Sequence, residues 1–572
     1  MIGGEFLIKT LTVEDVFTPE DFTEEHRAVR KTVDEFWRNE AEPVIGRIAH
    51  KDHDAAVELL RKSCELGLTG VVVPEAYGGM EMDLTSAMIV AEGLARDGSY
   101  AGWHGAHAGI GTLPVLLFGT EEQKQRYLPR LVAGELIGAY ALTEPHAGSD
   151  ALAAKTRADL NSEGTHYVLN GSKMWITNAG RADLFTVFAK IGGASDKFTA
   201  FLVERNTEGL SIGHEEAKMG IQGSSTCAVF FDNARVPAEN VLGEIGRGHI
   251  IAFNILNLGR LKLGPFAVGG AKQVLKVSAA YAQERQAFGG PIARFGMIQA
   301  KLAEMAVRTF AAETLSYAVC GFIESRLQEF SWSAPDAAKV KLKAIEEFAA
   351  ECSMVKVYAS EVLDYVVDEG VQIHGGYGYH QDYLVERAYR DSRINRIFEG
   401  TNEINRLLAT GMLLKRAVRG QLDLVGAVKR VQAALMEPPT PGVRMTPAAA
   451  AKSIALLALG AAYARFRDSL EQQQEVLAAL TDAAMGALVM ECVALRASRL
   501  AGSSKGELAA DVASVFHDEM LRTVEDAARL VLAASREGDE LRMSLAALKR
   551  LAKQEPVDVV AARRRIAARV LE

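Results

Sequence analysis

A block of β-type sequence lies between two helical regions, and this order constrains the fold more than any other feature of the chain. From about 135 to 245, short runs such as "HYVLNGSKMWIT" and "TCAVFFDNARVP" are separated by Asn-Gly, Gly and Asp-Asn turn signals, which is the pattern of strands. On both sides of this block apolar residues recur three and four positions apart, which is the period of a helix. We therefore expect a β domain between helical domains.

The later helical region divides in two. Between 246 and 415 the segments are long, for example "MIQAKLAEMAVRTFAAETLSYAVCGFIESRL", and they are suited to pair as a four-helix bundle. The stretch "MEPPTPGVRMTP" (436–447) has the prolines and glycine of a linker, and the Ala- and Leu-rich sequence 448–572 is helical again. The sequence predicts an α+β multidomain chain with an N-terminal helical domain at 1–134, a middle β-barrel domain at 135–245, a C-terminal four-helix bundle at 246–415 and an appended all-helical domain at 416–572.

The composition excludes several kinds of partner. The net charge of −9 over 572 residues gives no basic footprint for nucleic acid. The five cysteines show no C-x-x-C spacing and there is no H-E-x-x-H, so neither a disulfide framework nor a metal site is expected. The chain lacks a signal-peptide pattern and an uninterrupted apolar run of about 18 residues. We expect a cytoplasmic protein whose membrane contact, through a modestly basic tail at 551–572, is at most peripheral.

The stretch "IFEGTNEINR" (397–406) holds an acid, Glu399, between an apolar pair and a glycine. Two interpretations are open. Glu399 is either a solvated residue at a helix N-terminus, or a carboxylate beside apolar groups whose pKa is raised, as a general base requires. Taken alone, the motif favours the solvated residue.

Two stretches in the β block carry groups suited to a cofactor. In "YALTEPHAGSD" (140–150) the hydroxyls of Thr143 and Ser149 are suited to donate to a polar ring edge or a phosphate. In "KMWITNAGRAD" (173–183) Trp175 and Thr177 are two apart, so on a strand they share a face that suits the border of a flat cofactor. The alternatives are a Ser/Thr-rich turn and an aromatic core anchor.

Two more stretches lie in the bundle. In "ERQAFGGPIARFGMIQAKLAEM" (284–305) Arg285 offers the bidentate donors that suit a pyrophosphate and Phe288 closes a turn, although an arginine at a helix end is usually a surface charge. The stretch 371–406 has a Gly-rich turn that suits backbone amides close to a ligand.

In this order, T-E-P-x-A-G-S-D, W-I-T-N, R-x-x-F-G, Q-I-x-G-G-x-G and E-G-T resemble the motifs of the acyl-CoA dehydrogenase flavoprotein family, over about 20 to 415. The segment "AHAGIGTLPVLLFGTEEQKQRYLPRL", the "RFGMIQ" turn and the added C-terminal domain look most like the very-long-chain branch and its bacterial relatives. The resemblance implies FAD-dependent α,β-dehydrogenation of acyl-CoA to trans-2-enoyl-CoA in fatty-acid β-oxidation.

The resemblance also implies roles for single residues. Glu399 matches the base that takes the α-proton, while flavin N5 accepts the β-hydride. Thr143 and Thr177 would bond the flavin ring, with Trp175 against it, and Ser149 would contact phosphate where cofactor and substrate meet. The implied contacts to the FAD of a neighbouring subunit are Arg285, Phe288, Gln372 and Gly376, and those to the adenosine half are Thr401 and Glu403. Asn257 and Arg260 fall where relatives contact CoA.

The segment "GWHGAHAGIG" (102–111) corresponds in relatives to the closed end of the acyl pocket. Small residues recur there at helical spacing, namely Gly102, Gly105, Ala106 and Gly109. Small side chains at these positions would leave the acyl pocket deep, which favours long acyl chains. The alternative is that the glycines only permit close helix packing. His104 and His107 lie three apart but lack a carboxylate or cysteine to complete a metal site.

The resemblance implies two further partners, a second copy of the chain in a homodimer and an electron-transferring flavoprotein that accepts the electrons. Two other functions stay open. One is an acyl-CoA oxidase, which is reoxidised by oxygen, and the other is a catalytically idle paralogue that acts as an assembly factor.

Overall fold

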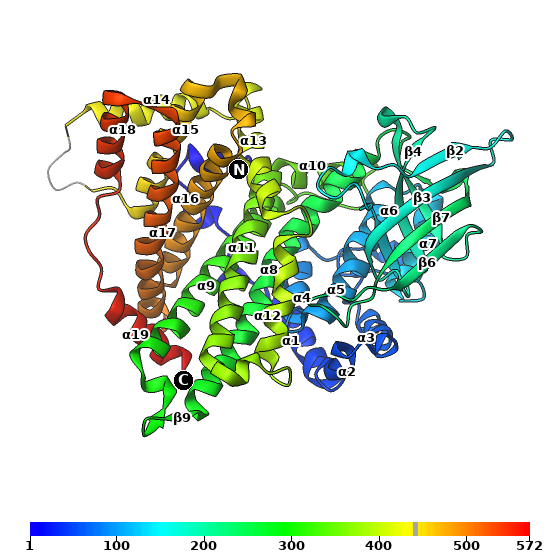
Figure 1. The fold of residues 1–572 in the computed structure, drawn as a ribbon, viewed down its shortest axis with the longest axis horizontal. Coiled ribbons are helices and arrows are strands. Elements are labelled where there is room, and N and C mark those ends of the chain that lie inside the picture. The colour runs from blue at the N-terminus through cyan, green and yellow to red at the C-terminus, as the bar shows by residue number, and fades with distance from the viewer. Residues whose placement is uncertain (439–443) are drawn as a thin grey trace.

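The computed structural model describes residues 1–438 and 444–572. Part of the predicted linker at 436–447 lies outside the described residues. The chain forms a β domain at one side, a long helical bundle in the middle and an appended layer of helices at the other side (Figure 1).

The N-terminal region is helical, as expected. Its helices are α1 (Glu24–Phe36), α2 (Ile45–Ala49), α3 (His53–Glu65), α4 (Leu84–Leu94), α5 (Gly98–Gly105), α6 (Leu113–Phe118) and α7 (Glu121–Val132). Thr23 and Thr120 cap α1 and α7, each accepting from the N–H three residues further on. Between α5 and α6 the chain makes a π-helical turn, η6 (Ala106–Gly111), a local widening that is frequent at functional sites.

The middle region is one eight-stranded sheet. Its strands are β1 (Gly138–Ala141), β2 (Arg157–Leu160), β3 (His166–Thr177), β4 (Leu184–Ile191), β5 (Phe198–Glu204), β6 (Leu210–Glu215), β7 (Thr226–Pro237) and β8 (Val241–Leu242). The order is β6-β7-β3-β2-β4-β5-β8, with β1 parallel to β4.

The sheet does not close, which corrects the expected barrel. Among the described residues β6 and β8 end the ladder without pairing with each other. Two strands separate β3 from β5 in the sheet, yet the rings of Tyr167 (β3) and Phe201 (β5) lie 5.2 Å apart. The sheet therefore folds over its own apolar core, which includes Leu169, Phe185 and Val229.

The bundle is built on long helices, as predicted. Its elements are α8 (Gly248–Glu284), α9 (Gly296–Glu324), α10 (Ala337–Glu347), α11 (Ala349–His374), α12 (Leu384–Ser392) and α13 (Asn402–Val418), and the short hairpin of β9 (Gln286–Ala287) and β10 (Gly290–Pro291) joins α8 to α9. α11 packs against α8, α9 and α13. α13 runs through the domain boundary that we expected at 415.

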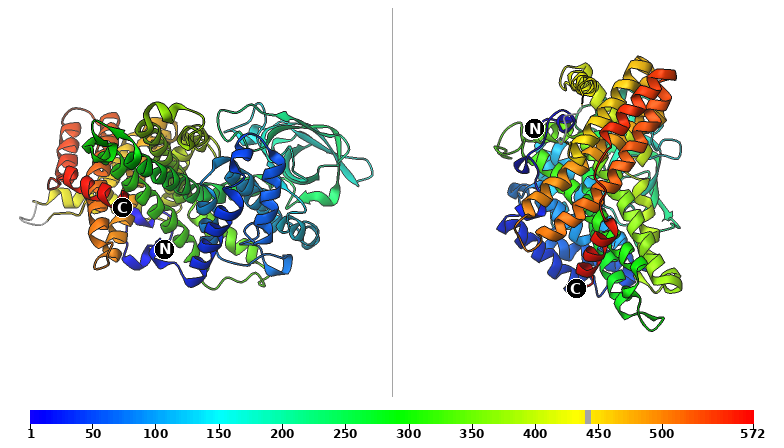
Figure 2. Two further views of the ribbon diagram at one scale, coloured as in Figure 1. Left: turned by 90° about the horizontal axis from the view of Figure 1, so that it is seen from below. Right: turned by 90° about the vertical axis from the view of Figure 1, so that its left-hand side faces the viewer.

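The appended region is all-helical. It comprises α14 (Leu424–Met436), α15 (Pro447–Phe466), α16 (Gln474–Leu500), α17 (Gly506–Ser535), α18 (Gly538–Leu551) and α19 (Val559–Val570). α16 packs against α9 and α13, and α19 against α9, so this layer lies along the bundle (Figure 2).

Two of these helical segments, 447–472 and 474–500, are long and apolar enough to cross a membrane by length and composition alone. Within the most apolar stretch of each, 61% and 89% of the residues are buried inside the protein. Core helices of a bundle have the same property.

The first 22 residues connect the appended region to the bundle. Arg496 of α16 forms ion pairs of 2.8 Å with Glu20 and with Glu313 of α9. One continuous apolar core includes Phe6 and Leu11 together with side chains of α9, α11 and α16. The appended helices are therefore part of the main core.

Candidate active site

Glu399 lies in a tight loop between η12 (Arg393–Arg396) and α13. Its φ angle is 58° and that of Gly400 is 80°. A left-handed conformation is unfavourable for glutamate and persists only where surrounding contacts impose it. The IFEGT turn is thus a strained site, and its contacts must explain the strain.

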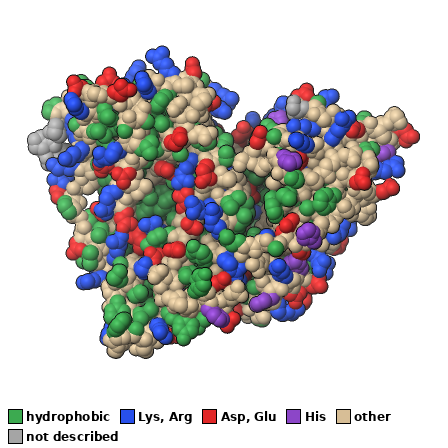
Figure 3. Space-filling view, in the orientation of Figure 1, with side chains coloured by type: hydrophobic (Ala, Val, Ile, Leu, Met, Phe, Trp, Pro, Cys, Tyr) green, Lys and Arg blue, Asp and Glu red, His purple; other side chains and the backbone are tan. Residues whose placement is uncertain are grey.

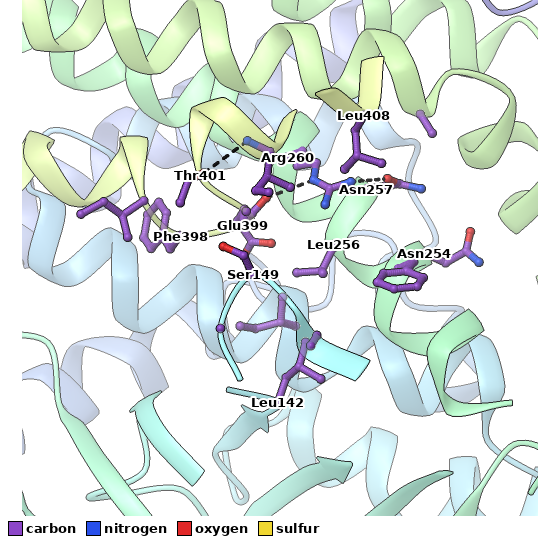
Figure 4. Close-up of a pocket in the computed structure, with 18 of the residues that line it drawn as sticks. Leu142, Ser149, Asn254, Leu256, Asn257, Arg260, Phe398, Glu399, Thr401 and Leu408 are labelled. Carbon is purple, nitrogen blue, oxygen red and sulfur yellow. Dashed lines mark hydrogen bonds between the residues drawn. The ribbon is translucent and has the colours of Figure 1, made fainter. Parts of the chain in front are cut away.

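Side chains from three helices hold the carbonyl groups of this loop. Arg260 Nε of α8 donates to Glu399 O at 3.0 Å, and Lys356 Nζ of α11 donates to Gly400 O at 2.8 Å. Asn405 Nδ2 of α13 donates to Gly400 O at 2.8 Å and to Thr401 O at 3.0 Å. These bonds fix the loop, and Figure 4 shows the Glu399 side chain extending from it toward the turn that carries Ser149.

The carboxyl group of Glu399 is desolvated. Oε2 is buried without a hydrogen-bond partner, and no ion pair of Glu399 occurs in the described part of the chain. Burial raises its pKa to about 7, against the opposing charges of Arg260 and Lys356. Of the two interpretations of the motif, the structure supports the carboxylate with a raised pKa.

Gly259 makes room for this carboxyl group. A Cβ atom added there would lie 2.6 Å from Glu399 Oε2, closer than any tolerated contact. The bare backbone of α8 therefore forms one wall of the site. The backbone N–H of Glu399 makes no hydrogen bond to the described residues.

A cleft of about 2100 Å³ opens in front of Glu399. Figure 3 shows the surface hollowed between the helical part and the β domain. The predicted site residues that line this cleft are Thr143, Ser149, Trp175, Thr177, Asn257, Arg260, Glu399 and Thr401. Residues from the β domain and from the bundle therefore meet across one opening.

The β-domain wall presents an indole ring. Trp175 is 55% exposed and has a φ of 62°, which turns its side chain out of the strand instead of into the core. The alternative of a core anchor is therefore wrong. The neighbouring TEPHAGSD turn is anchored by Glu144, whose Oε1 accepts from the buried Lys173 Nζ at 2.7 Å.

A second, inner cavity of about 150 Å³ continues from the cleft, and Glu399 and Thr177 line both. The residues of the predicted pocket that line it are Gly102, Gly105, Ala106 and Gly109. A Cβ added at Gly105 or Gly109 would meet nothing within 4 Å, so these two glycines face open space. The close-packing alternative applies instead to Gly111, where an added Cβ would lie 2.7 Å from the backbone of Gly138.

Arg285, Phe288, Gln372 and Gly376 lie outside the cleft. They are exposed at the far end of the bundle, where Phe288 is 90% exposed and the Arg285 guanidinium lies 5.6 Å from the centre of the Tyr377 ring. At 1.5 Å per helical residue, Arg285 is about 37 Å along α8 from Arg260. One ligand does not reach both groups within a single chain. Glu403 is also exposed, on the first turn of α13 and outside the cleft lining.

The structure assigns Arg260 a contact that we did not predict. The expected CoA contact stays a prediction, and in the structure the guanidinium is bonded to Glu399 O and, at 2.9 Å, to Asn257 Oδ1. Lys356 and Asn405 were missed altogether. A single lysine within the apolar run "MVKVYA" was the signal for Lys356, because a buried amine needs partners.

His107 uses both ring nitrogens inside the fold, at 2.9 Å from Leu131 O and 3.1 Å from the N–H of Gly138. In the part of the chain that the structure describes, no group of three or more His, Cys, Asp or Glu is arranged to hold a metal ion.

The carboxyl group of Glu399, with its raised pKa, faces an open cleft whose other wall offers an indole ring and hydroxyl groups, and this arrangement suits general-base chemistry beside a flat ligand.

Comparison with known proteins gives the family. Family models match in order: acyl-CoA dehydrogenase N-terminal domain at 23–135, middle domain at 139–234, C-terminal domain at 246–413 and a further C-terminal domain at 450–550. A probable acyl-CoA dehydrogenase of Bacillus subtilis (strain 168) is 47% identical over 580 residues, covering 100% of this chain and 97% of that protein. The chain belongs to the acyl-CoA dehydrogenase family.

Two more relatives place it within the family. The human mitochondrial very long-chain specific acyl-CoA dehydrogenase is 39% identical over 382 residues, which cover 65% of this chain and 54% of that protein. The crystal structure of an acyl-CoA dehydrogenase complexed with FAD from Bacillus anthracis is 47% identical, with a TM-score of 0.97, and covers 100% of this chain and 99% of that one. The chain is an oxidoreductase with FAD as its cofactor, and its relatives include the very-long-chain branch.

Proposed function

We propose that this protein dehydrogenates acyl-CoA thioesters between Cα and Cβ to give trans-2-enoyl-CoA, as a step of fatty-acid β-oxidation, with Glu399 as the base. One observation carries the proposal: the Glu399 carboxyl group, whose Oε2 has no hydrogen-bond partner among the described residues, has its pKa raised to about 7 and lies where the cleft and the inner cavity join. A thioester placed there has its CoA in the cleft and its acyl chain in the inner cavity.

The protein's own groups supply the proton chemistry. Glu399 takes the α-proton, and its raised pKa makes it a stronger base than an exposed carboxylate. The N–H of the same residue, which makes no hydrogen bond to the part of the chain that the structure describes, is suited to donate to the thioester oxygen, where negative charge develops. When bound, FAD supplies the acceptor for the β-hydrogen, which leaves as hydride to flavin N5.

The cleft residues fit FAD. The exposed indole of Trp175 provides a flat apolar face, Thr143 and Thr177 provide hydroxyls for a polar ring edge, and Ser149 lies on the turn across from Glu399. Thr401 lines the same cleft, and we propose that Thr401 and Glu403 serve the adenosine half.

We infer a homodimer from the residues at the far end of the bundle. Arg285, Phe288, Gln372 and Gly376 are exposed and too distant to serve the site of their own chain, so we propose that they contact the FAD of a second copy. The exposed Phe288 ring is consistent with a surface that a partner covers.

A ladder of acyl-CoA lengths tests the activity. Under anaerobic conditions acyl-CoA should bleach the flavin absorbance of the holoenzyme. Long acyl chains should be preferred if the glycines that line the inner cavity make it deep. An electron-transferring flavoprotein should then restore turnover. Hydrogen peroxide formation from acyl-CoA alone would favour the oxidase instead, and a purified protein without flavin would favour the assembly factor. The cytoplasmic location stays a prediction.

A further inference from the structure

The inner cavity carries polar groups that a plain hydrocarbon chain would leave without partners. His104, Ser224 and Asn395 line it and are 6%, 1% and 1% exposed. Within the described residues, His104 Nε2, Ser224 Oγ and Asn395 Oδ1 are buried and have no hydrogen-bond partner. Buried polar atoms in native proteins are nearly always paired, so three orphans in one cavity point to a polar occupant.

Lys262 adds a cation to the same wall. It lies on α8, one turn beyond Gly259, and lines the inner cavity. Burial, and then the charge of Lys341, lower its pKa to about 8. Neither a hydrogen bond nor an ion pair of Lys262 occurs in the described chain, whereas Lys272 on the same helix is paired with Glu92 at 2.7 Å and with Glu313.

His104 lies close enough to Lys262 to respond to its charge. Burial, with His107 and Lys262 adding to it, lowers the pKa of His104 to about 3, and a contact with the Leu68 carbonyl opposes the shift. The imidazole is therefore neutral, with its one N–H toward the Leu68 carbonyl, so the unpartnered ring nitrogen is a hydrogen-bond acceptor. The desolvated ammonium of Lys262 suits an oxygen acceptor such as a carboxylate or a hydroxyl, and a hydroxyl can also donate to the free ring nitrogen of His104.

The other titratable groups of the cavity are accounted for. Glu399 is the proposed base. Asp391 has its pKa raised to about 7 by burial and by Asp97, and it accepts from the N–H of Ile221. Arg387, which pairs with Asp97 at 3.3 Å, contributes to that cluster. Lys262 is the one cation lining the cavity, among the described residues, that lacks a partner.

We propose that the acyl group accepted by this enzyme carries oxygen beyond Cβ, as a carboxylate or a hydroxyl, that Lys262 donates to that oxygen inside the inner cavity, and that His104 accepts from it where it is a hydroxyl. The inference rests on the proposed function and names its substrate class. It accounts for a lysine and three orphaned polar atoms that a hydrocarbon tail does not use.

The test compares three CoA thioesters of equal chain length: decanoyl-CoA, decanedioyl-CoA and ω-hydroxydecanoyl-CoA. Anaerobic flavin reduction and kcat/KM with an artificial acceptor are measured on the FAD-loaded enzyme. The variants are Lys262→Met, which keeps length but removes the charge, and His104→Leu. The control is Lys276→Met, an exposed lysine on the same helix. Comparison of decanedioyl-CoA with ω-hydroxydecanoyl-CoA shows whether the enzyme binds a carboxylate or a hydroxyl.

We expect an oxygenated thioester to be preferred over decanoyl-CoA. We expect Lys262→Met to lower that preference by about tenfold or more, since hydrogen bonds to charged groups are the strong ones, while Lys276→Met leaves it unchanged. The inference would be overturned if wild type and Lys262→Met had the same ratio of kcat/KM for an oxygenated thioester to kcat/KM for decanoyl-CoA. The polar groups of the inner cavity would then bind only water. If decanoyl-CoA bleached the flavin and the two oxygenated thioesters did not, this inference would be overturned, while the proposed dehydrogenase function would stand. Failure of all three thioesters to bleach a flavin that is bound would overturn both.

Discussion

At the scale of single residues, the site balances two opposing influences on one carboxyl group. Desolvation raises the pKa of Glu399, and the cations of Arg260 and Lys356 lower it. Both cations are bonded to loop carbonyls and not to the carboxylate itself. The strained loop is thereby held without a direct ion pair, which would depress the pKa and weaken the base.

The pH dependence of flavin reduction follows from this balance. Only the deprotonated carboxyl group takes a proton, so the rate should rise with pH through about 7 and reach a plateau above it. Stopped-flow bleaching with one acyl-CoA across the pH range measures this. A midpoint near the ordinary glutamate value of about 4.3 would show that the carboxyl group is solvated during the reaction.

Lys356 provides a second prediction. Replacing Lys356 with Met removes a charge that lowers the pKa of Glu399, so the midpoint of the pH profile should move upward. The reduction rate at neutral pH should fall, because the loop loses its bond to Gly400 O. Lys356→Arg keeps the charge and should retain the lower midpoint. A slower enzyme with an unmoved midpoint would leave Lys356 a structural role only.

Sequence reasoning led to the prediction of Glu399 as the base through the neighbouring motifs, whereas the surroundings of its carboxyl group could not be predicted from the sequence. Lys356 and Asn405 act on the backbone of the loop, and such contacts have no sequence spacing of their own. The positive φ angles of Glu399 and Trp175 were also unpredictable, because tertiary contacts impose them.

At the scale of elements, α5 and η6 shape the inner cavity. The helix widens into a π-turn where it packs on β1, and glycines face open space on the cavity side. The periodicity predicted the helix but not the π-turn. Local patterns likewise predicted the strands, while the open ends of the sheet depend on non-local pairing that the sequence does not display.

Gly105 tests the depth of this cavity. A Gly105→Leu side chain enters open space, so we expect the fold to persist and the preferred acyl length to shorten. Each excluded methylene should cost about 0.8 kcal/mol of binding, roughly fourfold in kcat/KM. The acyl-CoA ladder measures the shift, with Gly46→Leu on the exposed face of α2 as the control. An unchanged ladder would mean that the chain does not pass Gly105.

At the scale of the whole molecule, the appended helices are joined to the catalytic bundle by a buried ion network. Arg496 of α16 bonds Glu20 and Glu313, and against burial, which raises it, the charges of Lys272 and then Arg496 hold the pKa of Glu313 well below its usual range. The sequence predicted the appended all-helical domain, and the structure confirms it, but long-range pairs of this kind are invisible in a single sequence. The network joins this domain to the bundle.

Removal of the central charge should destabilise the entire chain. We expect Arg496→Met to cost about 1.5–3 kcal/mol in the free energy of unfolding, because Glu20 loses its cation and Glu313 keeps only Lys272. Arg542→Met, in an exposed pair with Asp539, should cost less than about 1 kcal/mol. Urea denaturation compares the two. Equal, small losses would mean that the appended helices unfold independently of the bundle.

The most direct measurement is anaerobic flavin reduction by acyl-CoA in Glu399→Gln. The substitution keeps size and polarity and removes the base, so the variant should retain its FAD while the rate of bleaching falls by about a hundredfold or more. Glu35→Gln, on the exposed face of α1, is the control and should bleach normally. Bleaching of Glu399→Gln at the wild-type rate would contradict the account.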